Sequence, residues 1–206
     1  MKQLDWRLVI GAAFVLLGAL MFLERLGLVP GAVETFWGAL FLLGAAYFLY
    51  RFAESPQGEW WAAIPGFALA GLGMEALLPR FLGSLHGLFF LGALGLGFFA
   101  VYLTDRGRWW AIIPGGVLIT LGLIAVFSST FGAADSGGLL FVGLGVTFLL
   151  VAILAARSWA YIPGVILLAF GALIGAAFPG ASGLFWPAAL IAAGVIIIVR
   201  FVRNAQ

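Results

Sequence analysis

The chain has 206 residues, of which 65% are hydrophobic and 9% charged, and its formal net charge is +2. A soluble domain carries about 25% charged residues, so this composition predicts an integral membrane protein and excludes a soluble or disordered chain. The small net charge excludes a nucleic-acid-binding protein. With no cysteine and one histidine, the sequence excludes disulfides, thiolate metal sites and multi-histidine metal sites.

Eight continuously apolar runs of about the length of a membrane helix follow one another along the chain. They cover residues 6–23, 32–50, 60–78, 82–103, 109–127, 139–155, 159–178 and 184–199. Membrane strands alternate apolar and polar residues, so unbroken runs predict helices. The expected fold class is all-α, a polytopic integral membrane protein with eight transmembrane helices as four pseudo-repeated helical hairpins. We expect the first run to be retained rather than cleaved, because Glu24 and Arg25 follow it instead of a small-residue cleavage site.

The basic residues divide unequally between the two ends of these spans. Eight lie at the end that bears the N-terminus, and two, Arg25 and Arg80, lie at the other end. The eight are Lys2, Arg7, Arg51, Arg106, Arg108, Arg157, Arg200 and Arg203. Basic residues in short loops stay in the cytoplasm, so both termini are predicted to be cytoplasmic. Six of the eight tryptophans lie at the same end, which is typical of an interfacial aromatic belt; a quinone or haem platform is the alternative.

A tryptophan-proline-glycine segment recurs along the chain. Its prolines are Pro65, Pro114 and Pro163, which are separated by 49 and 49 residues, and a diverged copy begins near the N-terminus. Recurrence of identity and spacing indicates an internal repeat. We therefore predict a single membrane domain over residues 1–206, built from hairpin repeats at approximately 5–52, 58–106, 108–157 and 158–203.

Glycines also recur at corresponding positions in these copies. They are Gly18, Gly73, Gly122 and Gly171 in the odd-numbered spans, and Gly44, Gly95, Gly145 and Gly194 in the even-numbered spans. Lipid gives helices no hydrophobic reason to associate, so small residues that let two backbones approach predict helix contacts. The odd-numbered spans carry a further glycine seven residues earlier, and the resulting groove is predicted to receive a neighbouring helix, with the hairpin partner as the expected neighbour. A ligand groove is the alternative.

Few residues of the spans could carry chemistry. Glu75 lies about one turn inside the outer end of its span and is the candidate for an ion or proton site. The alternative is a boundary carboxylate paired with Arg80 or water. Thr120 and Thr147 are mid-span hydroxyls that can bond carbonyls of their own helix. No catalytic residue, cofactor site or metal site is predicted, and no phosphate-loop, metalloprotease or nucleophile-elbow motif occurs.

Two stretches carry a family resemblance. The glycine-rich first span leads into the turn Glu24-Arg25-Leu26-Gly27, and Phe36-Trp37 precedes a second span that contains Gly44. The last copy has Phe185-Trp186-Pro187 before Gly194. The pattern resembles the two-helix transmembrane region of bacterial LiaI/LiaF-type envelope-stress proteins, here repeated four times. That resemblance implies an accessory role in the two-component sensing of envelope damage, and a place in the cytoplasmic (inner) membrane of a bacterium.

These features predict a non-enzymatic membrane scaffold or accessory protein, linked by the resemblance to envelope homeostasis or stress sensing. Membrane lipids and other membrane proteins are its expected partners, no nucleic acid is expected, and the oligomeric state stays open. The alternative is a small-solute or ion transporter built from parallel hairpin repeats, and a membrane enzyme comes third. A water-filled cavity lined by Glu75 and the threonines would favour transport, whereas a fully packed bundle would favour a scaffold.

Overall fold

The computed structural model describes residues 6–78, 85–131 and 136–177, and these residues form an all-α fold. Seven α-helices lie within them. They are α1 (Trp6–Arg25), α2 (Ala32–Glu54), α3 (Ala63–Leu77), α5 (His86–Thr104), α6 (Ile112–Phe131), α7 (Ser136–Leu154) and α8 (Tyr161–Ala177). Short 3-10 turns at Trp60–Ala62, Trp109–Ala111 and Ser158–Ala160 lead directly into α3, α6 and α8. Eight spans were predicted; the last of them, 184–199, lies outside the described residues.

Six of the described helices are long and apolar enough to cross a membrane. At 1.5 Å per residue, the 19 residues of α7 give a length of about 28 Å, close to the roughly 30 Å of the hydrocarbon layer. The remaining helix is α3, which also corresponds to a predicted span. Its 15 residues give about 22 Å, and it carries Glu75 near its end.

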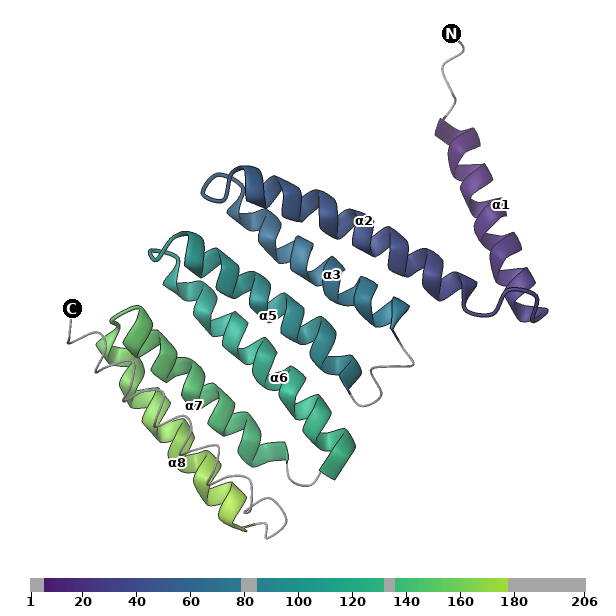
Figure 1. Cartoon of the computed structure of the whole chain (residues 1–206). Helices are drawn as coiled ribbons and strands as arrows, with labels where there is room; N and C mark the ends of the chain where they lie inside the picture. Colours follow the sequence, from purple (N-terminus) through teal and green to yellow (C-terminus); the bar gives the residue numbers. More distant parts are fainter. Residues whose placement is uncertain (1–5, 79–84, 132–135, 178–206) are drawn as a thin grey trace.

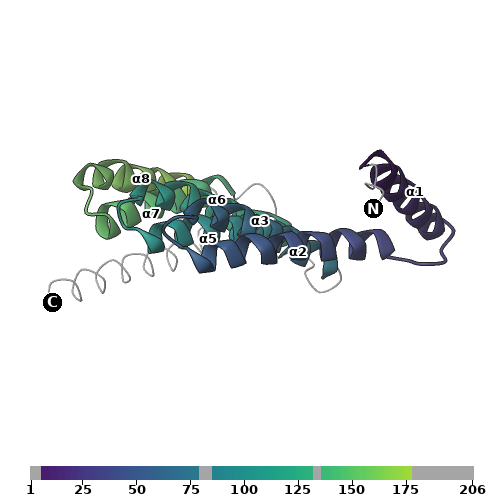
Figure 2. The ribbon, with the colours of Figure 1, turned by 90° about the horizontal axis from the view of Figure 1, so that it is seen from above.

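The helices from α2 to α8 stand side by side in one row, each antiparallel to the next (Figure 1). Packing follows the chain, because α2 contacts α3, α3 contacts α5, α5 contacts α6, α6 contacts α7 and α7 contacts α8. α2 and α8 are the two ends of this row (Figure 1), and in the view from above the helices between them overlap (Figure 2). The described helices therefore pack as an open row. Figures 1 and 2 also show that α1 leaves this row and points away from it.

The best-buried side chains lie at the end of the row where the 3-10 turns are. Val101, Ile112 and Val151 are fully buried there, in one cluster with Ala63 and Ala160. Each recurring proline is the third residue of its α-helix, as Pro114 is in α6. A helix has no intrahelical partner for the backbone N–H groups of its first turn, so a proline at this position removes no helical hydrogen bond.

A defined turn joins α1 to α2. The amide of Gly27, at φ 74°, donates to the Glu24 carbonyl at 2.9 Å, and the amide of Leu28 donates to the Leu23 carbonyl at 3.1 Å. This pair of bonds is the Schellman motif, which ends a helix at a left-handed glycine. The Glu24 carboxylate then accepts hydrogen bonds from the amides of Gly31 and Val33 at 3.2 and 3.1 Å. Glu24 therefore caps the start of α2 and holds the turn from both sides.

Candidate functional site

Six of the eight recurring glycines lie directly against a neighbouring helix. A Cβ atom at Gly73 would lie 2.7 Å from the Leu42 side chain, and one at Gly95 would lie 2.8 Å from the Gly115 carbonyl oxygen. The closest approaches at the other four are 3.1 Å at Gly44, 3.1 Å at Gly122, 2.7 Å at Gly145 and 2.7 Å at Gly171. At these positions the backbones approach closely because no side chain separates them.

The glycines of the odd-numbered spans face the helix that precedes them. Gly73 of α3 lies against α2, Gly122 of α6 lies against Leu88 and Leu91 of α5, and Gly171 of α8 lies against Val142 of α7. The expected neighbour was the following helix, the other half of the predicted hairpin, and for α3 and α6 that expectation is wrong. The close pairs are α2 with α3, α5 with α6, and α7 with α8, each joined through a tryptophan-containing turn. The repeat spacing identifies a face of each helix but does not tell which of two neighbours occupies it.

The two remaining recurring glycines differ from these six. Nothing lies within 4 Å of a Cβ atom at Gly18, because α1 stands away from the row. Gly194 lies outside the described residues. In α2, Gly44 is approached by the Leu69 side chain, and the adjacent Ala45 is 3% exposed.

Thr120 of α6 and Thr147 of α7 are the buried polar side chains of the described residues. Each hydroxyl donates to the carbonyl four residues earlier in its own helix, Thr120 to Gly116 and Thr147 to Gly143, both at 2.8 Å. The contacts across the interface are reciprocal. A Cβ atom at Gly143 would lie 2.8 Å from Thr120 Cβ, and one at Gly116 would lie 2.9 Å from Thr147 Cβ. Each threonine therefore fills the space left by a glycine of the other helix.

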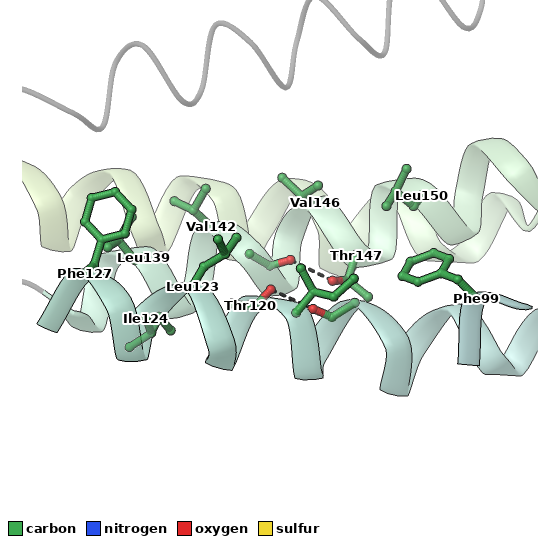
Figure 3. Close-up of a pocket in the computed structure, with 13 residues that line it drawn as sticks. Phe99, Thr120, Leu123, Ile124, Phe127, Leu139, Val142, Val146, Thr147 and Leu150 are labelled. Carbon is green, nitrogen blue, oxygen red and sulfur yellow. Dashed lines mark hydrogen bonds between the residues drawn. The ribbon is translucent and has the colours of Figure 1, made fainter. Parts of the chain in front are cut away.

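A cavity of about 330 Å³ lies along this interface. Figure 3 shows the threonine hydroxyls turned back to their own helices, among side chains that are otherwise hydrocarbon. Phe99, Leu123, Phe127 and Val142 contribute to that apolar wall. Such a lining suits hydrocarbon chains and offers few groups that could coordinate an ion.

The interface between α3 and α5 carries different residues at corresponding spacing. Gly71 lies 49 residues before Thr120, and Gly97 lies 50 residues before Thr147. A Cβ atom at Gly71 would lie 3.0 Å from Ala93 Cβ, and one at Gly97 would lie 3.0 Å from Phe67 Cβ. The contact Gly71–Ala93 thus corresponds to Thr120–Gly143. The larger residue of the pair is on the second helix, α5, in one interface and on the first helix, α6, in the other.

Glu75 is partly exposed on α3, and within the described residues it makes no hydrogen bond or ion pair. Its predicted partner Arg80 lies outside those residues. Glu75 lines neither the cavity between α6 and α7 nor a second apolar groove of about 430 Å³ beside Met74 and Leu96. The structure therefore does not bring Glu75 together with the threonines in a described cavity.

Aromatic rings and arginines join successive 3-10 turns at the tryptophan end of the row. Edge-to-face ring contacts occur in Phe48–Trp61 at 5.9 Å, Phe98–Trp110 at 6.3 Å, Phe148–Trp159 at 6.1 Å, Trp60–Trp110 at 6.0 Å and Trp109–Trp159 at 6.2 Å. The Arg108 guanidinium lies 5.0 Å from the Trp60 ring centre, and that of Arg157 lies 5.1 Å from the Trp109 ring centre. We call this set the tryptophan–arginine ladder. The tryptophan–tryptophan and arginine–tryptophan contacts join neighbouring turns, and the phenylalanine–tryptophan contacts join each turn to the helix before it.

Neither a metal centre in the described residues nor a related protein indicates what the chain does. Within the described residues, no group of three or more histidine, cysteine or acidic side chains could hold a metal ion. Comparison with known proteins finds no matching family model, no matching curated protein and no matching solved structure. The threonine–glycine contacts were missed at the sequence level, although the intervals of 49 and 50 residues from Gly71 and Gly97 were the signal that could have located them.

Proposed function

We propose that the chain is a non-enzymatic scaffold or accessory protein of the bacterial cytoplasmic membrane. In this proposal eight transmembrane helices form four repeats, and both termini are cytoplasmic. The eight-to-two division of basic residues supports the orientation. Contacts that recur at intervals of 49 or 50 residues, such as Arg108 on Trp60 and Arg157 on Trp109, support the repeat.

The observation that carries the scaffold proposal is how the polar side chains near the middle of the helices are hydrogen-bonded and packed. Thr120 and Thr147 are buried and donate to their own helices, and their methyl groups pack on glycines of the facing helix. A transporter needs polar groups that are free to coordinate its substrate near the membrane centre. Here those groups hold two helices together, which is the task of a structural protein.

The link to envelope homeostasis or stress sensing rests on the resemblance to LiaI/LiaF-type transmembrane regions. The tryptophan–arginine ladder is consistent with a role at a cytoplasmic membrane surface. Tryptophan is enriched at membrane–water interfaces, and basic residues next to a membrane are attracted to anionic headgroups. We infer that membrane lipids and other membrane proteins are the partners.

A small-solute or ion transporter is the second candidate, and one observation favours it. Glu75 is partly buried in an apolar helix without a hydrogen bond or ion pair among the described residues, and ionisable groups in membrane helices are usually functional. Proton and cation flux into proteoliposomes, compared between wild type and Glu75→Gln, separates the two functions. An ionophore verifies that the vesicles are sealed, size-exclusion chromatography verifies folding, and Glu54→Gln at the charged end of α2 serves as the matched variant.

The scaffold proposal expects no flux from any of the three proteins, because the amide of glutamine keeps the shape and hydrogen-bonding capacity of Glu75. Wild-type flux that Glu75→Gln abolishes and Glu54→Gln retains would make the protein a transporter.

A further inference from the structure

The cavity between α6 and α7 and the second apolar groove are counterparts in the repeat. Four lining residues of each lie at corresponding positions, 49 or 50 residues apart. They are Leu123, Val142, Gly143 and Val146 in the cavity, and Met74, Gly92, Ala93 and Leu96 in the second groove. Leu123 is 46% exposed and Leu96 is 53% exposed, so both open at the surface of the described row. In a membrane that surface meets hydrocarbon chains, which match the apolar linings.

The cavity between α6 and α7 extends toward the tryptophan end of the row. Phe127 lies at one end of it and Phe99 at the other (Figure 3). One turn beyond Phe99 in α5, the Tyr102 hydroxyl donates to the carbonyl of Leu154, the last residue of α7, at 3.0 Å. The Arg106 guanidinium carbon lies 4.6 Å from the Tyr102 ring centre. An arginine therefore follows the apolar cavity at its tryptophan end.

Arg157, in the turn after α7, reaches back toward the turn after α5. Its guanidinium carbon lies 5.1 Å from the ring centre of Trp109, which follows the turn that contains Arg106. Arg106 in return lies on Tyr102, whose hydroxyl is bonded to the end of α7. The two guanidinium groups are therefore held between the same two turns.

These two arginines form no ion pair within the described residues. The two turns contain one acidic residue, Asp105, whose carboxylate accepts from the Gly107 amide at 2.8 Å and lies 3.7 Å from the Arg108 guanidinium. Three arginines and one aspartate give the two turns a net charge of +2. Arg106 and Arg157 are both exposed. A positively charged site thus lies where the cavity approaches the tryptophan–arginine ladder.

The second groove has no such pair of arginines. At the positions 49 residues earlier, Gln57 replaces Arg106 and Arg108 replaces Arg157. Arg108 has partners of its own, because it lies near Asp105 and donates to the Gln57 carbonyl oxygen at 3.2 Å. The chain therefore contains two similar apolar hollows that differ in the charge at one end.

We propose that the cavity between α6 and α7 binds an anionic phospholipid, with a hydrocarbon chain along the cavity and the phosphate group between Arg106 and Arg157. Guanidinium groups bind phosphate through charge-assisted hydrogen bonds, and tryptophans lie at the depth of lipid headgroups. The second groove accepts hydrocarbon chains without selecting the headgroup. Placing the phosphate in the cytoplasmic leaflet rests on the orientation in the proposed function, whereas binding requires only that the chain lie in a bilayer.

Photoreactive lipids test the site in the unaltered protein. The chain is reconstituted in phosphatidylcholine nanodiscs with a probe that carries a photoreactive group in one acyl chain, either anionic phosphatidylglycerol or zwitterionic phosphatidylcholine. We expect the phosphatidylglycerol probe to label Leu123 and Val146 more strongly than the phosphatidylcholine probe, and both probes to label Leu96 equally. Equal labelling of the cavity by both probes would overturn the proposal. Absence of labelling there would also overturn it, because another segment or another copy would then occupy the cavity.

A double variant removes the positive site and leaves the cavity. One basic residue near a membrane strengthens the attraction of an anionic lipid by about fivefold, so Arg106→Gln with Arg157→Gln should lower the preference for phosphatidylglycerol by up to about 25-fold. Arg7→Gln with Arg25→Gln removes the same charge from α1, away from the row, and should keep the preference. An equal loss in both double variants would reduce the effect to net charge and contradict the site. Helicity and size-exclusion chromatography verify folding.

The cavity itself is tested by filling it. Val146→Phe should lower the labelling of Leu123 by phosphatidylglycerol, whereas Leu96→Phe, at the corresponding position of the second groove, should not. Equal effects of the two variants would contradict binding in the cavity.

A competition with inorganic phosphate distinguishes a lipid from a free anion. Sodium phosphate, compared with sodium chloride at the same ionic strength, should leave the phosphatidylglycerol labelling unchanged. Displacement of the lipid by phosphate would indicate a site for the free anion and overturn the proposal. These measurements depend neither on orientation nor on flux, so a failed lipid site is distinguishable from a failed scaffold function.

Discussion

At the scale of single residues, Thr120 and Thr147 show how a hydroxyl can be buried in an apolar interface. Each side chain bonds the carbonyl four residues earlier in its own helix, which satisfies its polar atom. Its methyl group is then free to pack on a glycine across the interface. The threonine–glycine pairs thus combine hydrogen-bond satisfaction with close packing.

A size exchange tests this interpretation. Gly143→Ala places a methyl group 2.8 Å from Thr120 Cβ, so it should destabilise the protein by about 1–3 kcal/mol, as overpacking does. Adding Thr120→Gly recreates the Gly71–Ala93 pair of the other interface and should recover most of that loss. Thermal unfolding in mild detergent, measured for the single and double variants, gives the coupling between the two positions.

Thr147→Gly is the matched control, because the Thr147 side chain packs on Gly116 of the other helix and touches Gly143 only through the backbone carbonyl of its own helix, on the side away from a Cβ atom at position 143. If Thr147→Gly rescued Gly143→Ala as well as Thr120→Gly does, the direct contact between positions 120 and 143 would be refuted.

At the scale of helices, seven of the eight predicted spans coincide with described helices, of which six are long and apolar enough to cross a membrane, but several predicted ends are displaced. Arg25, Arg51 and Glu54 lie inside helices, although the predicted spans end before them. A charge stops a span from entering the hydrocarbon layer, yet it does not interrupt the backbone hydrogen bonds of a helix. The predicted span 82–103 is described as a helix from His86.

The glycine faces were predictable in position, and their neighbours were not. A spacing of seven residues is enough to place Gly66 and Gly73 on one side of a helix. The choice between α2 and α5 depends on the whole interface, including the contacts of Gly71 with Phe89 and Ala93, which periodicity does not reveal. Gly18 is exposed because the turn held by Glu24 directs α1 away from the row. Hydrophobic periodicity does not reveal that direction.

The recurring glycines give a prediction at the helix scale. Gly73→Ile, Gly122→Ile and Gly171→Ile should each destabilise the fold by about 1–3 kcal/mol, because a neighbouring helix lies within 3.1 Å of each Cβ position. Gly18→Ile should leave the stability of a single copy unchanged, since its surroundings are open. The midpoints of thermal unfolding in detergent, measured for the four variants at a low protein concentration, provide the comparison. Equal midpoints for all four would reject a packing role.

At the scale of the whole molecule, the short loops and the distribution of basic residues predict one orientation. Gln57 lies in the turn between α2 and α3, which should face the cytoplasm. Gln57→Cys should therefore resist an impermeant thiol reagent in intact cells and react after permeabilisation. Leu28→Cys, in the exposed turn between α1 and α2, should react in intact cells. Labelling of position 57 from outside would reverse the proposed topology.

The brevity of α3 has a consequence for the lipid around the protein. In the eight-span arrangement, the row would present about 22 Å of helix at α3 and about 28 Å at α7. A bilayer accommodates a short span by thinning locally, at a fraction of a kcal/mol for each ångström of hydrophobic mismatch. The leaflets would then be drawn together near Glu75 and would relax toward α7. The protein would therefore favour membranes that are already thin.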